Sequence, residues 1–427
     1  MKYRENHYVP RWYQERFLPT SGERKFRYLD LSPEQFRDPN GILRTKTALW
    51  RWGAPSCFKE TDLYTVKYGQ YESTDIEQFF FGKVDDEGRD AIEFFSRYGS
   101  FDDLKAPTSL DDVFHSLLTY MSVQKFRTPK GLHYLSALIR EADKNRLLLD
   151  LQRLQNLHCA IWTEAVWAIA SADHTQTKFI VTDHPVTVYN REVFPDSEYA
   201  KAFTDPDIRM NGTHTFFPLS PTRILILTNL SWARNPYGNG TTPRPNPKLF
   251  RSAMFNFTEI QTGRQLDEVE VNQINFIMKR RAKKFIAAAE EEWLYPERKI
   301  PTEHWRKLDD RYLLMPDPRC LYLGGEILIG YKDGRSESYD EYGRRPWQKG
   351  YQRGVERTES RTLDAFQGEF ARLFGPTRRG SSYRMGGKKA DVDSPDFHQY
   401  HLDLEKKHLP AGFKQRRDAR CIKKGGR

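Results

Sequence analysis

The chain has 427 residues and a formal net charge of +10, with a pI of about 9.2; 30% of its residues are charged, 38% hydrophobic and 14% aromatic. Its length predicts more than one structural unit, and its aromatic content excludes a wholly disordered chain. No apolar run approaches the roughly 18–20 residues that span a bilayer, which argues against a membrane partner and favours a cytoplasmic protein. The four cysteines are far apart and form no CxxC pair, so neither a disulfide framework nor a zinc ribbon is predicted.

The segment from Asn6 to Tyr13 brings a histidine, an arginine and several aromatic residues together near the N-terminus. Pro10 suits the first turn of a helix, which predicts a short helix reaching about Phe17. His7 would then lie just before a helix N-terminus, where free backbone N–H groups favour an anion. The alternative is that the aromatic side chains anchor the terminus to the core and His7 is a satisfied polar neighbour.

A second marked segment ends the helix predicted from about Leu110 to Arg127, which Pro129 terminates. One face of this helix is an apolar stripe that ends in Gln124 and Arg127. Arginine is rarely buried without a partner. Either the helix end emerges into solvent, or these two polar groups point into a cleft.

A third segment follows a stretch, residues 133–171, that is predicted to be helical. Residues 178–182 predict a buried strand that stops at Asp183, His184 and Pro185. An Asp–His pair at a strand end is a candidate for chemistry, because the scaffold is rigid there and the tip is open. The alternative is an aspartate that binds the backbone of its own turn.

Two later segments add polar candidates. Residues 213–227 predict a β-hairpin whose turn contains Ser220. Residues 266–294 predict a long helix that carries Asn275 and a basic run at 279–284. Such a run is either a solvated face or a phosphate-binding surface.

We predict that the chain has three units: a main domain over residues 1–296, a β-hairpin and helix over 297–376, and a basic tail over 377–427. The tail has 14 Lys and Arg against 6 Asp and Glu, so it holds +8 of the net charge. It lacks apolar periodicity and is predicted to be disordered and dispensable for stability. The predicted fold class is α+β, with a mainly helical core and a small mixed or antiparallel sheet.

In this order, four segments resemble motifs of the bacterial family called domain of unknown function 4238: HYVPR at 7–11, QKFRTP at 124–129, TDHPV at 182–186 and FPLSP at 217–221. The resemblance covers roughly residues 5–290, and HYVPR is its most specific part. It implies no reaction. In the family the position of His184 is more often asparagine, which favours Asp183 over His184 as a catalytic group.

The polar groups at these element ends are the candidate site. His7 and Asp183 are the candidate catalytic residues, since a carboxylate can orient an imidazole that acts as a general base. The other six are candidate substrate-binding residues, and the arginines among them suit a phosphate or carboxylate: Arg11, Gln124, Arg127, His184, Ser220 and Asn275. We expect His7, the helix end near Arg127 and the turn at Asp183 to meet around one cavity.

Two classes of function follow from these residues. One is a hydrolase, such as a nuclease, that acts on a phosphate-containing substrate. The other is a non-catalytic module that binds nucleic acid or protein, in which the polar motifs form a structural hydrogen-bond network. Burial distinguishes them, because a buried and satisfied cluster favours the module and an open pocket favours the enzyme. No HExxH, GxGxxG, GxxxxGK[ST] or GxSxG pattern occurs, so no metal or cofactor is predicted.

Overall fold

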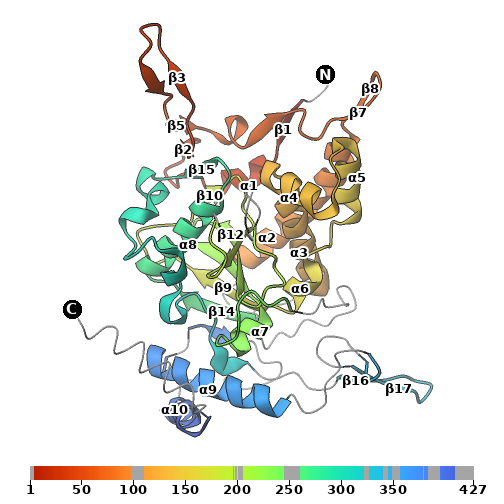
Figure 1. Ribbon diagram of the computed structural model, residues 1–427, viewed down its shortest axis with the longest axis vertical. Helices are drawn as coiled ribbons and strands as arrows, with labels where there is room; N and C mark the ends of the chain where they lie inside the picture. The colour runs from red at the N-terminus through yellow and green to blue at the C-terminus, as the bar shows by residue number, and fades with distance from the viewer. Residues whose placement is uncertain are drawn as a thin grey trace.

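The computed structural model describes residues 4–97, 110–195, 197, 200, 205–244, 260–321, 327–339, 345–348, 356–377, 379–382 and 395–408. Its architecture is α+β, as predicted, and a β-hairpin and helix lie in the C-terminal part (Figure 1). No helix among these residues has the length and apolar character needed to cross a membrane.

The larger of two central sheets has six strands in the order β11–β12–β13–β9–β14–β18. Neighbouring strands are antiparallel except for the parallel pair β9–β14. The strands are β9 (Val166–Ser171), β11 (Thr187–Asn190), β12 (Thr213–Ser220), β13 (Arg223–Thr228), β14 (Ile260–Gln265) and β18 (Ser381–Ser382).

The second sheet is antiparallel and has four strands in the order β10–β15–β2–β5. Four two-stranded antiparallel sheets, β1–β6, β3–β4, β7–β8 and β16–β17, complete the described strands. The bounds are β1 (Glu5–His7), β2 (Phe26–Asp30), β3 (Gln35–Arg37), β4 (Leu43–Thr45), β5 (Leu49–Trp52), β6 (Lys59–Thr61), β7 (Val66–Tyr68), β8 (Tyr71–Ser73), β10 (Val181–Thr182), β15 (Phe285–Ala288), β16 (Ile327–Gly330) and β17 (Ser336–Tyr339).

Helices cover both faces of the six-stranded sheet (Figure 1). A group from α2 to α6 lies on one side, α8 lies on the other, and α9 with α10 lies at the C-terminal end. The bounds are α1 (Arg11–Glu15), α2 (Gly82–Arg97), α3 (Leu110–Arg127), α4 (Pro129–Ile139), α5 (Lys144–Arg153), α6 (Cys159–Thr163), α7 (Leu230–Arg234), α8 (Glu268–Arg281), α9 (Glu356–Phe374) and α10 (Pro395–His408).

Two segments predicted to be helical are strands. In β9, Trp167 and Ile169 pack toward α2 and α3, while Ala168 and Ala170 pack toward α8, so the strand is buried on both faces. Such a strand has a continuous apolar pattern that periodicity cannot separate from a buried helix. In β15, pairing with β2 and β10 overrides the helical preference of its alanines.

The predicted boundary between α3 and α4 is correct, and its chemistry is local. Pro129 occupies the first turn of α4, and the Thr128 hydroxyl caps that helix by accepting a bond from Gly131 N at 3.0 Å. A Cβ on Gly131 would lie 1.9 Å from the Lys125 carbonyl oxygen, so only glycine lets α4 turn back this tightly.

Two arginines tie the C-terminal part together and join it to the main domain. Arg319 lies wholly buried beside Asp317 and donates to the carbonyls of Gly375 and Thr377 at 2.8 and 3.0 Å. Arg379 binds the Glu270 carboxylate and the Leu313 carbonyl. The domain boundaries at 296 and 376 remain predictions.

Two segments of the tail predicted to be disordered instead form regular structure. Strand β18 extends the six-stranded sheet beside β14, and α10 packs against α9. A Cβ on Gly368 of α9 would lie 2.5 Å from Glu405 of α10, which shows how closely the helices cross. The prediction failed for these segments because their contacts are with residues distant in sequence. Residues 383–394 and 409–427 lie outside the described part of the chain.

We therefore expect truncation after Thr377 to lower the free energy of unfolding by roughly 1–3 kcal/mol, because it removes the Arg379 contacts, β18 and α10. Urea denaturation of the truncated and full chains measures the difference. A chain truncated after His408 is the control and should match the full chain. If all three chains were equally stable, the original prediction that the tail is dispensable for stability would be correct.

Candidate functional site

The HYVPR segment anchors the N-terminus, and His7 stays partly accessible. Tyr8 and Val9 are buried, and the backbone N–H of Tyr8 donates to the Phe58 carbonyl at 3.0 Å. His7 belongs to β1, is half-buried, and its Nε2 lies 3.3 Å from the Pro55 carbonyl oxygen. Arg11 is exposed at the start of α1, which is shorter than predicted.

Gln124 and Arg127 are brought together and are both buried. The Arg127 Nε donates to Gln124 Oε1 at 2.6 Å, and its Nη2 lies 2.8 Å from Asp85 Oδ1. The Gln124 Nε2 donates to the Tyr8 carbonyl at 2.9 Å. These contacts tie α3 to α2 and to the N-terminal segment, so the polar end of the stripe is neither solvated nor part of a cleft.

The Asp183 carboxylate binds the backbone at the start of β15. Its carboxylate accepts from the backbone N–H groups of Lys283, Lys284 and Phe285 at 2.8, 2.6 and 2.8 Å. Burial raises the pKa of Asp183, and these three donors oppose the rise. Among the described residues, none of the hydrogen bonds of Asp183 goes to His7.

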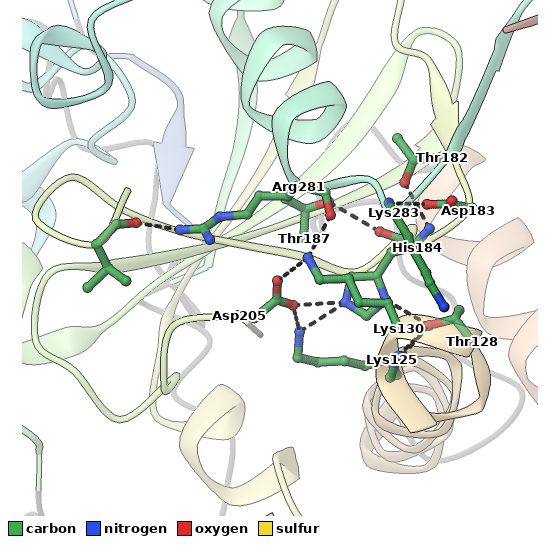
Figure 2. Close-up of polar contacts among 12 residues, drawn as sticks. Lys125, Thr128, Lys130, Thr182, Asp183, His184, Thr187, Asp205, Arg281 and Lys283 are labelled. Carbon is green, nitrogen blue, oxygen red and sulfur yellow. Dashed lines mark hydrogen bonds and ion pairs between the residues drawn. The ribbon is translucent and has the colours of Figure 1, made fainter. Parts of the chain in front are cut away.

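A buried ionic cluster surrounds the neighbouring residue, His184 (Figure 2). Its Nε2 lies 2.8 Å from Asp205 Oδ2, and its Nδ1 lies 2.8 Å from the Thr128 hydroxyl. Lys125 Nζ binds the same Asp205 oxygen, and Lys130 Nζ lies 2.6 Å from the other. We call Lys125, Lys130, His184 and Asp205 the buried cluster.

The buried cluster is electrostatically self-contained. Burial lowers the pKa of both lysines, and Asp205 partly offsets this effect. Burial alone would raise the pKa of Asp205, but the two lysines hold it well below its usual value. The cluster joins α3, α4, the turn at 183–185 and, through the bond from Lys130 to the Arg281 carbonyl, the end of α8. Perturbed pKa values mark active sites and structural ion networks alike, and here every charge has a partner.

The last two predicted residues bind local backbone. The Ser220 hydroxyl accepts from Thr222 N at 3.2 Å at the turn between β12 and β13. Asn275 accepts from Ile180 N and donates to the Lys178 carbonyl, which fixes α8 to the segment before β10. A cavity of about 780 Å³ opens between α2 and α3, lined partly by Phe79, Lys83 and His115, and it contains none of the eight predicted residues.

Two buried histidines are expected to make the free energy of unfolding depend on pH. Burial lowers the pKa of His184 to about 4 and that of His158 to about 3. Both are neutral in the folded state, while the unfolded chain takes up their protons below about pH 6.5. Their contribution is therefore present above pH 6.5 and is lost as the pH falls toward 4, by about 1.4 kcal/mol per pH unit for each.

His158→Phe isolates one of these terms, because its ring stacks on Phe126 at 4.8 Å and its Nδ1 makes no hydrogen bond to any described residue. We expect the slope of unfolding free energy against pH near pH 5 to fall by about 1.4 kcal/mol per unit. His174→Gln, at an exposed position, should leave the slope unchanged. An unchanged slope in His158→Phe would contradict the assignment. Urea denaturation from pH 4.5 to 7 measures it.

A different group of side chains reaches the surface on the four-stranded sheet. Four rings follow one another: Phe285 and Tyr28 with centroids 4.9 Å apart, Tyr28 and Trp52 at 5.7 Å, and Trp52 and Trp50 at 4.9 Å. Their planes differ by only 17–25°, so the rings are stacked. Tyr28 is buried, whereas Trp52 is 39% exposed. We call these four residues the aromatic stack.

Positive charge lies at the Phe285 end of the aromatic stack. Lys284 Nζ lies 5.0 Å from the centroid of the Phe285 ring and 3.7 Å from Asp30 Oδ2, and the neighbouring Lys283 side chain is exposed. The turn at Ala54–Ser56 follows β5, and its Pro55 carbonyl oxygen lies 3.3 Å from His7 Nε2. Burial lowers the pKa of His7, and the charges of Arg11 and Lys59 lower it further.

The aromatic stack and the buried cluster were not predicted. The Trp-Arg-Trp alternation at 50–52 is a signal of one exposed strand face, and Lys125 and Lys130 lie beside residues that were predicted. Asp205 carried no signal, because it lies in a polar loop and gains its partners only on folding. No group of three or more potential metal-ligating His, Cys, Asp or Glu side chains gathers within the described residues.

These contacts define an α+β protein whose marked polar segments bind one another and whose accessible aromatic surface lies elsewhere. The chain belongs to the family described as "Protein of unknown function (DUF4238)", whose model matches residues 5–292. The predicted resemblance is thereby confirmed. No curated protein and no solved structure matches the chain significantly.

Proposed function

We propose that the protein binds single-stranded nucleic acid on the aromatic stack and that its polar motifs form the structural network that supports this surface. The observation that carries the proposal is a four-ring stack whose most exposed ring, Trp52, is 39% exposed, with Lys284 beside the ring at one end, Phe285. Every base has a planar face, and stacking on an aromatic side chain contributes about 1–3 kcal/mol per base without requiring a sequence.

The flanking charges suit the phosphates of such a strand. Lys283 and Lys284 lie beside Phe285, and the charges of Arg11 and Lys59 act on His7, which contacts the turn after β5. Arg11, predicted to bind a phosphate-bearing substrate, keeps that role here, and His7, predicted to be catalytic, is proposed instead as a second phosphate contact. Binding through lysines and arginines releases counterions, so affinity should fall steeply as salt rises.

Burial favours binding over catalysis. Gln124, Arg127, Asp183 and His184 are inaccessible and are bonded within the protein. A hydrolase that uses His7 and Asp183 would need these groups to share a substrate, while Asp183 is held by three backbone donors.

Trp52→Ala tests the proposal. We expect it to weaken binding of a fluorescent single-stranded oligonucleotide roughly 5- to 100-fold, because it removes the most exposed ring of the aromatic stack. Fluorescence anisotropy at two salt concentrations, with DNA and with RNA, measures the affinity. Trp347→Ala is the matched control, since this tryptophan is 72% exposed and follows β17, at the opposite end of the molecule in Figure 1.

Equal affinities of Trp52→Ala and the parent protein would contradict the proposal, even if the basic tail binds nucleic acid on its own. Cleavage of the oligonucleotide by the parent protein, lost in His7→Ala, would favour the hydrolase instead.

A further inference from the structure

The aromatic stack lies at the base of a long two-stranded arm. Strands β3 and β4 continue β2 and β5 outward: Asp30 N donates to the Ala48 carbonyl at 2.8 Å, and Lys46 N donates to the Glu34 carbonyl at 2.9 Å. Figure 1 shows β3 standing clear of the body above β2 and β5. Every residue of β3 and β4 is exposed. We call residues 34–46 the arm.

The tip of the arm is held in one conformation. The Asp38 carboxylate accepts from the backbone N–H groups of Asn40 and Ile42 at 2.9 and 3.0 Å and from Arg44 Nε at 2.7 Å. Gly41 supplies the positive φ, 78°, that the turn needs. A rigid tip loses little conformational freedom when it binds a partner.

Both faces of the arm carry the same chemistry. Phe36 pairs with Arg44 across the strands, and Arg37 pairs with Leu43, so each face presents one apolar side chain and one arginine. Phe36 and Leu43 are 41% and 57% exposed. The arm's two carboxylates pair with cations of the arm, Asp38 with Arg44 and Glu34 with Lys46. Arg37 donates to the Gly41 carbonyl at 3.0 Å, so it is the arginine of the arm whose charge no carboxylate of the arm neutralises.

These features favour a partner that encloses the arm. A two-stranded hairpin exposed on both faces is only marginally stable in water. A flat protein surface would cover one face and leave the other apolar side chain exposed. The major groove of B-form DNA is about 12 Å wide, admits a two-stranded ribbon, and offers phosphates to arginine and thymine methyl groups to apolar side chains.

We infer that the arm enters the major groove of duplex DNA while the adjoining single strand lies on the aromatic stack, so that the preferred ligand is a duplex with a single-stranded overhang. This inference rests on the proposed function, because it places the duplex beside the strand that the stack holds. The continuity of β2 with β3 and of β5 with β4 sets the two contacts next to each other.

Anisotropy with three DNA ligands tests the inference: a single strand, a blunt duplex, and that duplex with the single strand as an overhang. The parent protein should bind the overhang ligand roughly tenfold more tightly than the single strand. Phe36→Ser/Leu43→Ser should abolish this preference and leave single-strand affinity unchanged, since both side chains are exposed. Tyr71→Ser, an exposed aromatic change on the β7–β8 hairpin, should keep the preference.

Different experimental results would contradict the proposed function and the inference about the arm. If the parent shows no preference for the overhang ligand, or if the preference survives Phe36→Ser/Leu43→Ser, the inference about the arm is wrong. The proposal that the aromatic stack binds a single strand is then unaffected. If the parent does not bind a single strand, the proposed function is wrong, and so is the inference that the protein prefers a duplex with a single-stranded overhang. If the parent sediments as a dimer and the arm variant as a monomer, a second copy of the chain occupies the arm and the inference is wrong.

Discussion

Asp205→Asn is expected to lower the free energy of unfolding by about 3–5 kcal/mol, the cost of leaving buried charges without their partner. Asp205 is the only carboxylate among the described residues that pairs with Lys125 and Lys130, and it also contacts His184. All four side chains are at most 5% exposed, so water cannot replace the lost carboxylate.

The pH dependence of this variant identifies the cause. Burial already lowers the pKa of both lysines, and loss of Asp205 lowers it further. A lowered lysine pKa means that stability is lost as the pH falls below the unfolded value of about 10.4. Asp205→Asn should therefore recover part of its stability between pH 7 and 10, as measured by urea denaturation.

Asp333→Asn is the control, because this aspartate is exposed beside Arg335 and its removal should cost under about 0.5 kcal/mol. If Asp205→Asn were as stable as the parent and lost nucleic-acid binding instead, the cluster would be functional rather than structural.

Arg127→Met is expected to cost about 3 kcal/mol, the lower end of the range for breaking a buried ion pair, because it leaves Asp85, whose side chain is 21% exposed, without its partner. Arg127 is 1% exposed, pairs with Asp85, and lies 5.5 and 5.7 Å from the ring centroids of Phe81 and Tyr120. Methionine keeps much of the packing volume and removes every donor. Arg127→Lys should also destabilise, since lysine cannot reach Gln124 and Asp85 with a planar fork.

A double-mutant cycle with Asp85→Asn separates the ion pair from packing. If the pair is the source of the cost, Arg127→Met should destabilise the Asp85→Asn background less than the parent, with a coupling energy above about 1 kcal/mol. Purely additive losses would show that packing on Phe81 and Tyr120 carries the effect.

Local signals allowed part of the fold to be predicted. The end of α3 and the start of α4 follow from Thr128 and Pro129, and the β12–β13 hairpin follows from its alternating pattern and turn residues. Strands β9 and β15 were missed because burial on both faces and long-range pairing leave no period in the sequence. Strand β18 and α10 were missed because their partners lie in β14 and α9.

The marked polar residues were found, but the sequence could not reveal how they are bonded. An arginine at the end of an apolar stripe needs a partner, and nothing near it in the sequence identifies Asp85 as that partner. Asp183 was recognised as a turn residue or a catalytic group, while its three donors come from a segment one hundred residues later. The aromatic stack was missed because Tyr28, Trp50 and Phe285 meet only through sheet pairing.

The most direct test of the account is to locate a bound strand. An oligonucleotide carrying a photoreactive base is crosslinked to the full chain, and the attached peptides are identified by mass spectrometry. We expect crosslinks to peptides containing Trp50, Trp52 or Phe285, and their loss in Trp52→Ala. Crosslinks confined to residues 377–427, unaffected by Trp52→Ala, would contradict it and assign binding to the basic tail.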